Sequence, residues 1–110
     1  MSFDMAPYRM IGRIHTPNFD MMHYVYILYL ANQQLYTGST ADLKRRTKEH
    51  ENGQVESTCH KRPLKLIHYE AYKRKSDAQR REKFLKTTEG KKLLRQQIKD
   101  TLIELNYKTT

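Results

Sequence analysis

The sequence predicts an α+β fold, with three strands and three helices in the order β-β-α-β-α-α. Two observations predict this class. First, three segments are rich in aromatic and β-branched residues, a composition typical of strands. Second, the segments that separate and follow them carry helix-start signals or apolar residues at helical spacing. With 110 residues, the chain is long enough for one hydrophobic core and too short for two.

The first two strands are expected to form a hairpin. Residues 23–30, HYVYILYL, are apolar on both faces, which indicates a strand buried on two sides. The polar residues ANQQ follow, and LYTG at 35–38 provides the second strand. Because so short a connection joins antiparallel neighbours, we expect these two strands to pair with each other.

A helix is expected over residues 40–51. Ser39 and Asp42 have the spacing of a capping box at its start, and Asn52 followed by Gly53 provides a stop signal. This helix contains only one leucine, so its role in building the core is limited.

One strand and two helices complete the predicted domain. The third strand is LKLIHYEAY at 64–72. Ser76 with Gln79 forms a second capping-box candidate, which opens a helix over 77–87. A last amphipathic helix covers 89–105, and its apolar face comprises Leu94, Ile98, Leu102 and Leu105.

These elements place a single domain at residues 23–105. Residues 1–22 show neither helical nor alternating periodicity, so we interpret them as an N-terminal extension or arm, and residues 106–110 as a C-terminal tail. The sequence lacks an apolar run near the roughly 20 residues needed to cross a bilayer, and it lacks a signal peptide. We therefore expect a cytoplasmic protein without a membrane partner. The single cysteine, Cys59, argues against structural zinc and internal disulfides.

The charge of the chain is strongly basic. It contains 21 Lys and Arg against 12 Asp and Glu, and residues 61–99 alone hold fourteen basic and four acidic residues. A polyanion such as DNA is the natural partner, and a merely solvated basic surface is the alternative. We expect DNA contacts from six basic residues: Lys44, Arg45, Lys61, Arg62, Arg80 and Arg81.

The helix over 40–51 carries charge on the face that should pack. Leu43, Arg46, Thr47 and His50 share one stripe, so an arginine and a histidine lie at the rim of the contact made by the leucine. Buried charge requires a partner or a function. The alternative is that Arg46 extends to water and His50 caps the helix end.

The helix over 77–87 also carries a charge on the face that should pack, but here the charge is negative. Ala78, Glu82 and Leu85 fall on one face, which places a carboxylate in the middle of the packing side. Glu82 either forms a salt bridge to a nearby arginine or holds a hard divalent cation whose other ligands are mostly water.

Tyrosines supply the third element of the candidate site. Tyr26 lies in the first strand and Tyr36 in the neighbouring strand, although packing alone explains many strand tyrosines. Their convergence with Arg46, His50 and Glu82 is more informative. A phenol can handle a proton, an arginine can stabilise phosphate charge and a carboxylate can hold a metal, which are the parts of metal-assisted phosphodiester hydrolysis.

This combination of motifs resembles the GIY-YIG nuclease family, most closely its small single-domain bacterial members. The resemblance covers roughly residues 22–88. The motifs that carry it are VYI at 25–27, YTG at 36–38, Arg46 eight residues after that glycine, His50 four residues further on, and Glu82 within RREKFLK.

The resemblance implies a compact domain in which helices flank a three-stranded antiparallel β-sheet. It also implies hydrolysis of DNA with one divalent cation, Mg²⁺ or Mn²⁺. Tyr26 and Tyr36 correspond to the two family tyrosines, and we assign the general-base role to this pair, with Tyr26 preferred. By the same resemblance, Arg46 would contact the scissile phosphate and His50 would position the water or a tyrosine. Glu82 would be the metal ligand.

A tyrosine base presents a chemical difficulty, because the ordinary pKa of its phenol is about 10. A cationic neighbour or metal-bound water must lower that pKa, and Arg46 is the candidate neighbour.

Two functions remain open on the sequence. The first is a metal-dependent endonuclease acting on damaged, branched or single-stranded DNA, as in DNA repair. The second is a catalytically degenerate nucleic-acid-binding module. In both cases we expect the protein to be a monomer or a weak homodimer, and a protein partner could direct it to its DNA.

Overall fold

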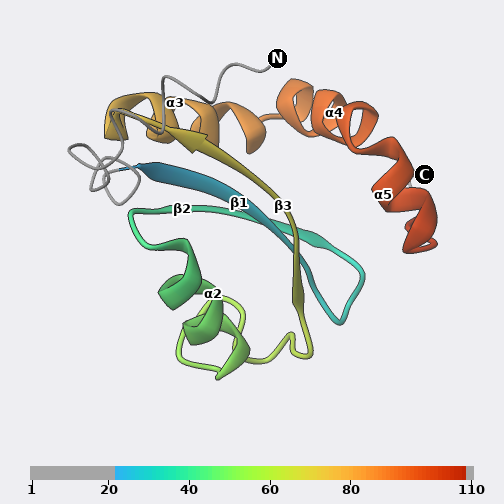
Figure 1. The fold of residues 1–110 in the computed structure, drawn as a ribbon. Coiled ribbons are helices and arrows are strands. Elements are labelled where there is room, and N and C mark those ends of the chain that lie inside the picture. Colours follow the sequence, from blue (N-terminus) through green and yellow to red (C-terminus); the bar gives the residue numbers. More distant parts are fainter. Residues whose placement is uncertain (1–21, 109–110) are drawn as a thin grey trace, which may run out of the picture.

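The computed structural model describes residues 22–108 and confirms the α+β class (Figure 1). The expected N-terminal arm lies outside the described residues except for Met22, as do the last two residues of the expected tail. In chain order the elements are β1 (His23–Tyr29), β2 (Leu35–Thr40), α2 (Leu43–Glu51), β3 (Lys65–Tyr72), α3 (Lys75–Leu85), α4 (Thr88–Gln97) and α5 (Lys99–Glu104).

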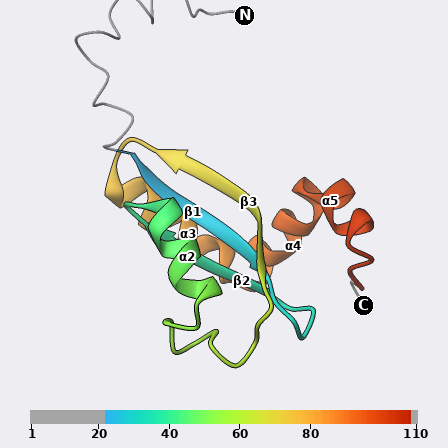
Figure 2. The same cartoon turned by 60° about the horizontal axis from the view of Figure 1, so that its bottom comes forward.

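The three strands form one antiparallel sheet in the order β2-β1-β3. The helix α2 lies on one face of this sheet, and α3, α4 and α5 lie on the other side (Figure 1; Figure 2). The central position of β1 explains its apolar composition, because residues 25–28 are all buried. The expectation of a strand covered on both faces is therefore confirmed.

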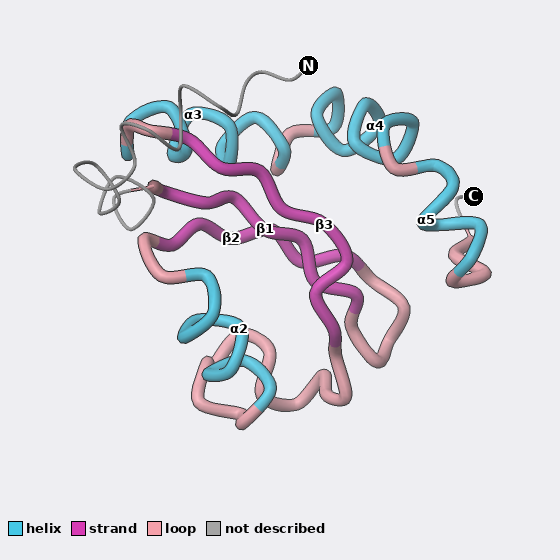
Figure 3. Tube along the Cα trace, viewed as in Figure 1, coloured by secondary structure: helices cyan, strands magenta, loops and turns pink. Residues whose placement is uncertain are grey.

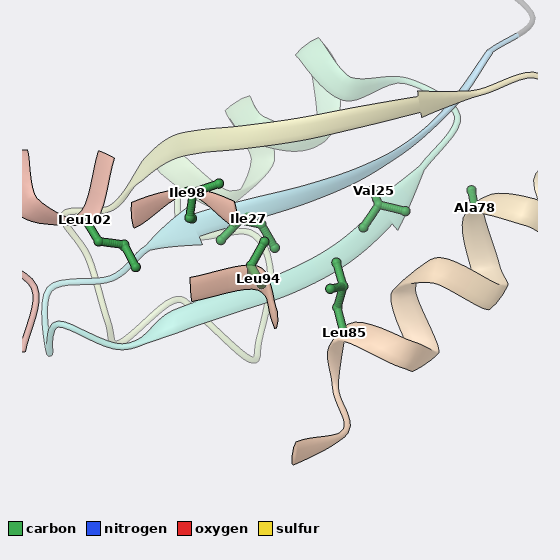
Figure 4. Close-up of a cluster of buried hydrophobic side chains, with 7 residues drawn as sticks. All are labelled: Val25, Ile27, Ala78, Leu85, Leu94, Ile98 and Leu102. Carbon is green, nitrogen blue, oxygen red and sulfur yellow. The ribbon is translucent and has the colours of Figure 1, made fainter. Parts of the chain in front are cut away.

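Alternation along β1 divides the core into two clusters. Val25 and Ile27 point toward α3, α4 and α5, where they pack with the remaining members of the larger cluster: Ala78, Leu85, Leu94, Ile98 and Leu102 (Figure 4). Tyr26 and Leu28 point to the opposite face and form the smaller cluster with Leu30. Leu43 packs against this smaller cluster, so it docks α2 on the sheet as expected.

The segment predicted as one final helix over 89–105 forms two helices instead (Figure 3). The backbone leaves the helical region at Ile98, with φ −110° and ψ 35°, and the chain changes direction there. The break leaves Leu94, which precedes it, and Leu102, which follows it, in the same core cluster. The observed element order is therefore β-β-α-β-α-α-α.

The two predicted capping boxes are wrong. Ser39 belongs to β2, and α2 begins only at Leu43, where the Asp42 side chain accepts a hydrogen bond from the Arg45 backbone at 3.1 Å. Pairing with β1 extends the strand beyond the predicted end at residue 38, which delays the helix.

At the start of α3, Arg74 is the N-cap and makes no side-chain capping bond, so Ser76 lies inside the first turn. The predicted stop of α2 is confirmed, because Asn52 is the C-cap and Gly53 adopts a φ of +78°.

None of the helices in the described part of the chain is both long enough and apolar enough to cross a membrane.

Candidate active site

Tyr26 occupies the centre of the candidate site, and Gly38 makes room for it. The two residues face each other across β1 and β2, and Tyr26 is 1% exposed. A Cβ atom at Gly38 would lie 2.5 Å from both Cζ and Oη of Tyr26. A side chain at position 38 would therefore displace the phenol. This contact is a physical reason for the glycine in YTG.

His50 holds the phenol from the end of α2. Its Nε2 lies 2.8 Å from Tyr26 Oη, and its Nδ1 lies 2.7 Å from Thr58 Oγ1 in the following loop. His50 is fully buried. Burial and the positive charge of Arg46 lower the pKa of His50, against an opposing effect of Glu49. The ring is therefore neutral near pH 7, with one donor and one acceptor nitrogen.

Tyr36 is the more accessible of the two candidate tyrosines. Its ring centroid lies 5.2 Å from that of His50 in an edge-on arrangement, and 6.4 Å from that of Tyr26. Its hydroxyl accepts a hydrogen bond from Ser57 at 3.3 Å. The three rings thus form one cluster on the face of the sheet that α2 covers.

The pKa of Tyr26 is raised above its ordinary value. Burial is the main cause, and the charges of Tyr36 and Glu82 act in the same direction. The Arg46 guanidinium lowers the pKa, as expected from the sequence, but burial outweighs it. Tyr26 is therefore a protonated phenol at neutral pH.

Arg46 lies at the rim of the contact between α2 and the sheet. Its side chain is 37% exposed, and its Nη1 donates a hydrogen bond to Glu49 Oε1 at 2.9 Å. The guanidinium is thus close enough to Tyr26 to affect its proton affinity and open enough to meet a phosphate group.

Glu82 reaches the site from the opposite side of β2. Consecutive side chains in a strand point to opposite faces of the sheet, so the side chain of Ser39, the residue after Gly38, lies on the α3 face. There its hydroxyl donates a hydrogen bond to Glu82 Oε1 at 2.6 Å. Glu82 Oε2 accepts from Lys86 Nζ at 3.0 Å. The partner cation of this carboxylate is therefore a lysine, where the sequence suggested an arginine as the non-metal alternative.

The carboxylate of Glu82 fits one particular kind of metal site. Within residues 22–108, no group of three or more His, Cys, Asp and Glu is arranged to hold an ion. An all-protein cage is thus absent from the described part of the chain. Mg²⁺, however, typically keeps several waters and binds through one or two carboxylates together with substrate phosphates. Glu82, 22% exposed, offers such a single ligand.

The six basic residues expected to contact DNA differ in their surroundings. Lys44 and Lys61 are exposed and form no ion pair within residues 22–108. Arg45 lies near Asp42 and Glu49, and Arg80 pairs with Asp77 at 2.7 Å, but the Arg45 and Arg80 side chains are largely exposed. These four remain candidates for contact with a polyanion.

The other two arginines are engaged within the fold. Arg62 donates to the backbone carbonyls of Cys59 and Glu51, which ties the loop after α2 together. Arg81 donates twice to Glu70 and once to Gln97, which connects α3 to β3 and α4. Their guanidinium groups therefore have internal partners, which sequence spacing alone does not reveal.

Sequence reasoning missed Ser39, Thr58 and Lys86. The spacing of four residues between Glu82 and Lys86 predicts their pairing on a helix. The position of Ser39, directly after the glycine, places its side chain on the opposite face of β2. Thr58 carries no comparable signal, because a loop conformation brings it to His50.

Comparison with known proteins identifies the family of this chain. A model of the GIY-YIG catalytic domain matches residues 22–95, so the chain belongs to the GIY-YIG family, a family of nucleases. Within it, the chain is similar to UPF0213 proteins. It is 37% identical over 87 residues to one from Clostridium perfringens, with 78% of this chain and 94% of that protein covered.

A UPF0213 protein of Haloquadratum walsbyi is 35% identical over 85 residues, which cover 76% of this chain and 93% of that protein. Among solved structures, the solution NMR structure of a UPF0213 protein from Bacillus halodurans matches with a TM-score of 0.45 and 36% identity. That match covers 67% of this chain and 82% of that chain.

Proposed function

We propose that this protein is a divalent-metal-dependent endonuclease that hydrolyses DNA. One observation carries the proposal: the residues of the predicted site converge on one part of the fold, with His50, Tyr36 and Arg46 on the same face of the sheet as the buried phenol of Tyr26 and Glu82 on the other face. His50 is hydrogen-bonded to this phenol, and Tyr36, Arg46 and Glu82 lie close enough to change its proton affinity. Clusters of perturbed titratable groups are typical of catalytic sites.

Tyr26 acts in this proposal as a proton relay. Because burial keeps the phenol protonated, it is poorly suited to be a preformed phenolate. Its Oη can accept a proton from the attacking water while its own proton passes to the neutral Nε2 of His50. The imidazolium keeps its Nδ1 hydrogen bond to Thr58 and later returns its extra proton to Tyr26 Oη, as Tyr26 gives the proton taken from water to the departing product.

Arg46 and Glu82 supply the electrostatic part of the mechanism. The guanidinium stabilises negative charge on the scissile phosphate. Glu82 would hold the divalent cation. Ser39 would keep its hydrogen bond to Oε1 and orient the carboxylate, while Lys86 would give up its bond to Oε2 so that this oxygen could bind the metal. When bound, Mg²⁺ or Mn²⁺ supplies further charge stabilisation and lowers the pKa of nearby water.

A panel of DNA substrates tests this proposal. Supercoiled plasmid, a single strand, a flap and a four-way junction are incubated with Mg²⁺, Mn²⁺ or EDTA. The proposal predicts cutting of at least one substrate with metal and none in EDTA. Equal cutting in EDTA would contradict the metal requirement.

A second candidate is a nucleic-acid-binding module without catalysis. The observation in its favour is that both carboxylate oxygens of Glu82 already have partners, Ser39 and Lys86. This candidate predicts binding to every DNA in the panel without cutting. It also predicts that the logarithm of the binding constant falls linearly with the logarithm of salt concentration. Metal-dependent cutting would exclude it.

A further inference from the structure

A groove separates α2 from the β1–β3 side of the sheet, and the catalytic scheme does not use it. Its volume is about 720 Å³, within the range of about 300–1,000 Å³ typical of ligand sites. We call it the α2–β3 groove. Its main lining residues are Tyr24, Leu43, Lys44, Lys48, Leu66 and Tyr69.

An aromatic pair forms one wall of the groove. The rings of Tyr24 and Tyr69 meet edge to face, with centroids 6.1 Å apart. Tyr69 is 53% exposed, one of the few large apolar side chains with such exposure in residues 22–108. The contact with Tyr24 fixes the orientation of this ring while much of its surface stays open. An oriented, accessible aromatic ring is a platform on which a planar ligand can stack.

Cationic groups line the helical wall. Lys44 and Lys48 are exposed on successive turns of α2, and neither forms an ion pair within the described residues. Asp42 also lines the groove, but its carboxylate caps α2 and pairs with Arg45. The two free ammonium groups therefore complement an anionic ligand.

One further polar group is available to a ligand. Glu51, also in the lining, is exposed and can accept a hydrogen bond from an amino group on a base edge. The groove thus combines a stacking surface, two cations and a carboxylate.

The groove lies next to the candidate active site in the sheet register. Tyr69 faces Tyr26 directly across β3 and β1, and Tyr24 lies two residues before Tyr26 on the same face. Tyr69 is therefore the cross-strand neighbour of the residue that carries the proposed catalytic phenol.

We propose that the α2–β3 groove binds an unpaired nucleobase of the DNA substrate, stacked on Tyr69, with the adjoining phosphates on Lys44 and Lys48. The inference rests on the proposed nuclease function and specifies its substrate class as DNA with a single-stranded segment. A base in continuous duplex is stacked between its neighbours and must be unstacked before it can enter such a groove. A single strand offers its bases without that cost.

Fluorescence anisotropy in EDTA tests the proposal independently of cleavage. The full chain is titrated onto a labelled mixed-sequence single strand and onto the matching duplex. We expect tighter binding to the single strand, and a loss of about five- to a hundredfold on Tyr69→Ala, the range for removal of one base–aromatic stack. Tyr69→Phe retains the ring and should restore binding.

Matched controls separate stacking from general effects. Ile103→Ala removes an exposed apolar side chain from α5, and should leave binding unchanged. Lys44→Gln with Lys48→Gln should weaken binding more than Lys91→Gln with Lys92→Gln on α4, on the other side of the sheet. A 2-aminopurine base in the single strand reports stacking directly. Its fluorescence should fall on binding to the wild type but not to Tyr69→Ala.

The outcomes distinguish this inference from the proposed function. If the protein binds as predicted but cuts no DNA, the groove assignment stands and the nuclease proposal fails. If metal-dependent cutting occurs but Tyr69→Ala binds single strands like the wild type, the groove assignment is overturned. A Tyr69→Ala effect on self-association in sedimentation, with unchanged DNA binding, would also overturn it in favour of a second copy of the chain.

Discussion

At the scale of single residues, the site depends on close contacts that cross β2. Gly38 leaves space for the phenol of Tyr26, and the next residue, Ser39, points the other way to hold Glu82. The common stripe of Arg46 and His50 on α2 could be predicted from the sequence because helical spacing defines it. The space that Gly38 leaves for Tyr26 could not, because it depends on the register between β1 and β2. Thr58 could not, because the loop after α2 has no periodicity that fixes which of its side chains reaches His50.

Gly38→Ala tests the role of the glycine. The added methyl group would meet Tyr26 at 2.5 Å, so either the phenol or β2 must move. We expect a loss of about 1–3 kcal/mol in the free energy of unfolding, measured in urea, as for other overpacked sites. DNA cleavage should also fall. Thr37→Ala, in the same strand, is the control, and equal stability of wild type and Gly38→Ala would contradict the contact.

Tyr26→Phe and His50→Gln test the proton relay. Each change breaks the bond between the two side chains, so each should lower the cleavage rate by about 10²–10⁴-fold, the usual contribution of proton transfer. Because the residues act as one unit, the double variant should be no slower than the slower single variant. Single-turnover rates measure this. Multiplicative losses would show that the two residues act separately.

The pH dependence of cleavage tests the protonation state of His50. The relay needs the neutral ring, so activity should be lost as the pH falls through the pKa of His50. Burial and Arg46 place that pKa below 6.5, so the acid limb of kcat/KM should lie below pH 6.5. The limb should be absent from any residual activity of His50→Gln. A limb above pH 7 would contradict the assignment.

At the scale of elements, the type of each segment was predictable and its ends were less so. The apolar residues on both faces of β1 and the stripe containing Leu43 are set by burial, which the sequence records directly. The start of α2 depends on how far β2 pairs with β1, and the break at Ile98 accompanies the packing of Leu94 and Leu102 in one core cluster. Both are tertiary effects that no local pattern encodes.

The connection between β3 and α3 rests on Glu70. Burial raises the pKa of its carboxyl, but hydrogen bonds from Arg81, Tyr72 and His68 outweigh burial and bring the pKa to about 2. Because the folded pKa lies below the ordinary value of 4.5, the stabilisation is present above pH 4.5 and is lost as the pH falls toward 2.

Glu70→Gln should therefore destabilise the protein at neutral pH, by up to about 3 kcal/mol. The variant should also flatten the decline of stability between pH 4.5 and 2. Urea unfolding at several pH values measures both effects, with Glu104→Gln on α5 as the control. A parallel decline in wild type and Glu70→Gln would show that other carboxyls control acid stability.

At the scale of the whole molecule, the sheet divides the proposed chemistry between its two faces. The proton relay lies under α2, while Glu82 projects from α3 on the other side. The two groups come nearest at consecutive residues of β2, because Gly38 contacts Tyr26 and Ser39 contacts Glu82. The proposed reaction therefore requires the scissile phosphate to approach β2, which is an edge strand of the sheet. Net charge predicted a polyanionic partner, but only the fold shows that Arg62 and Arg81 serve internal contacts.

The most direct test of the central claim is single-turnover DNA cleavage as a function of Mg²⁺ concentration, for the wild type, Glu82→Ala and Glu104→Ala. Binding of the same DNA is measured in EDTA. The account predicts metal-dependent cleavage by the wild type and by Glu104→Ala, and no cleavage by Glu82→Ala despite retained binding. Cleavage by Glu82→Ala at the wild-type rate would contradict the role of this carboxylate, and binding without cleavage by all three proteins would contradict the nuclease itself.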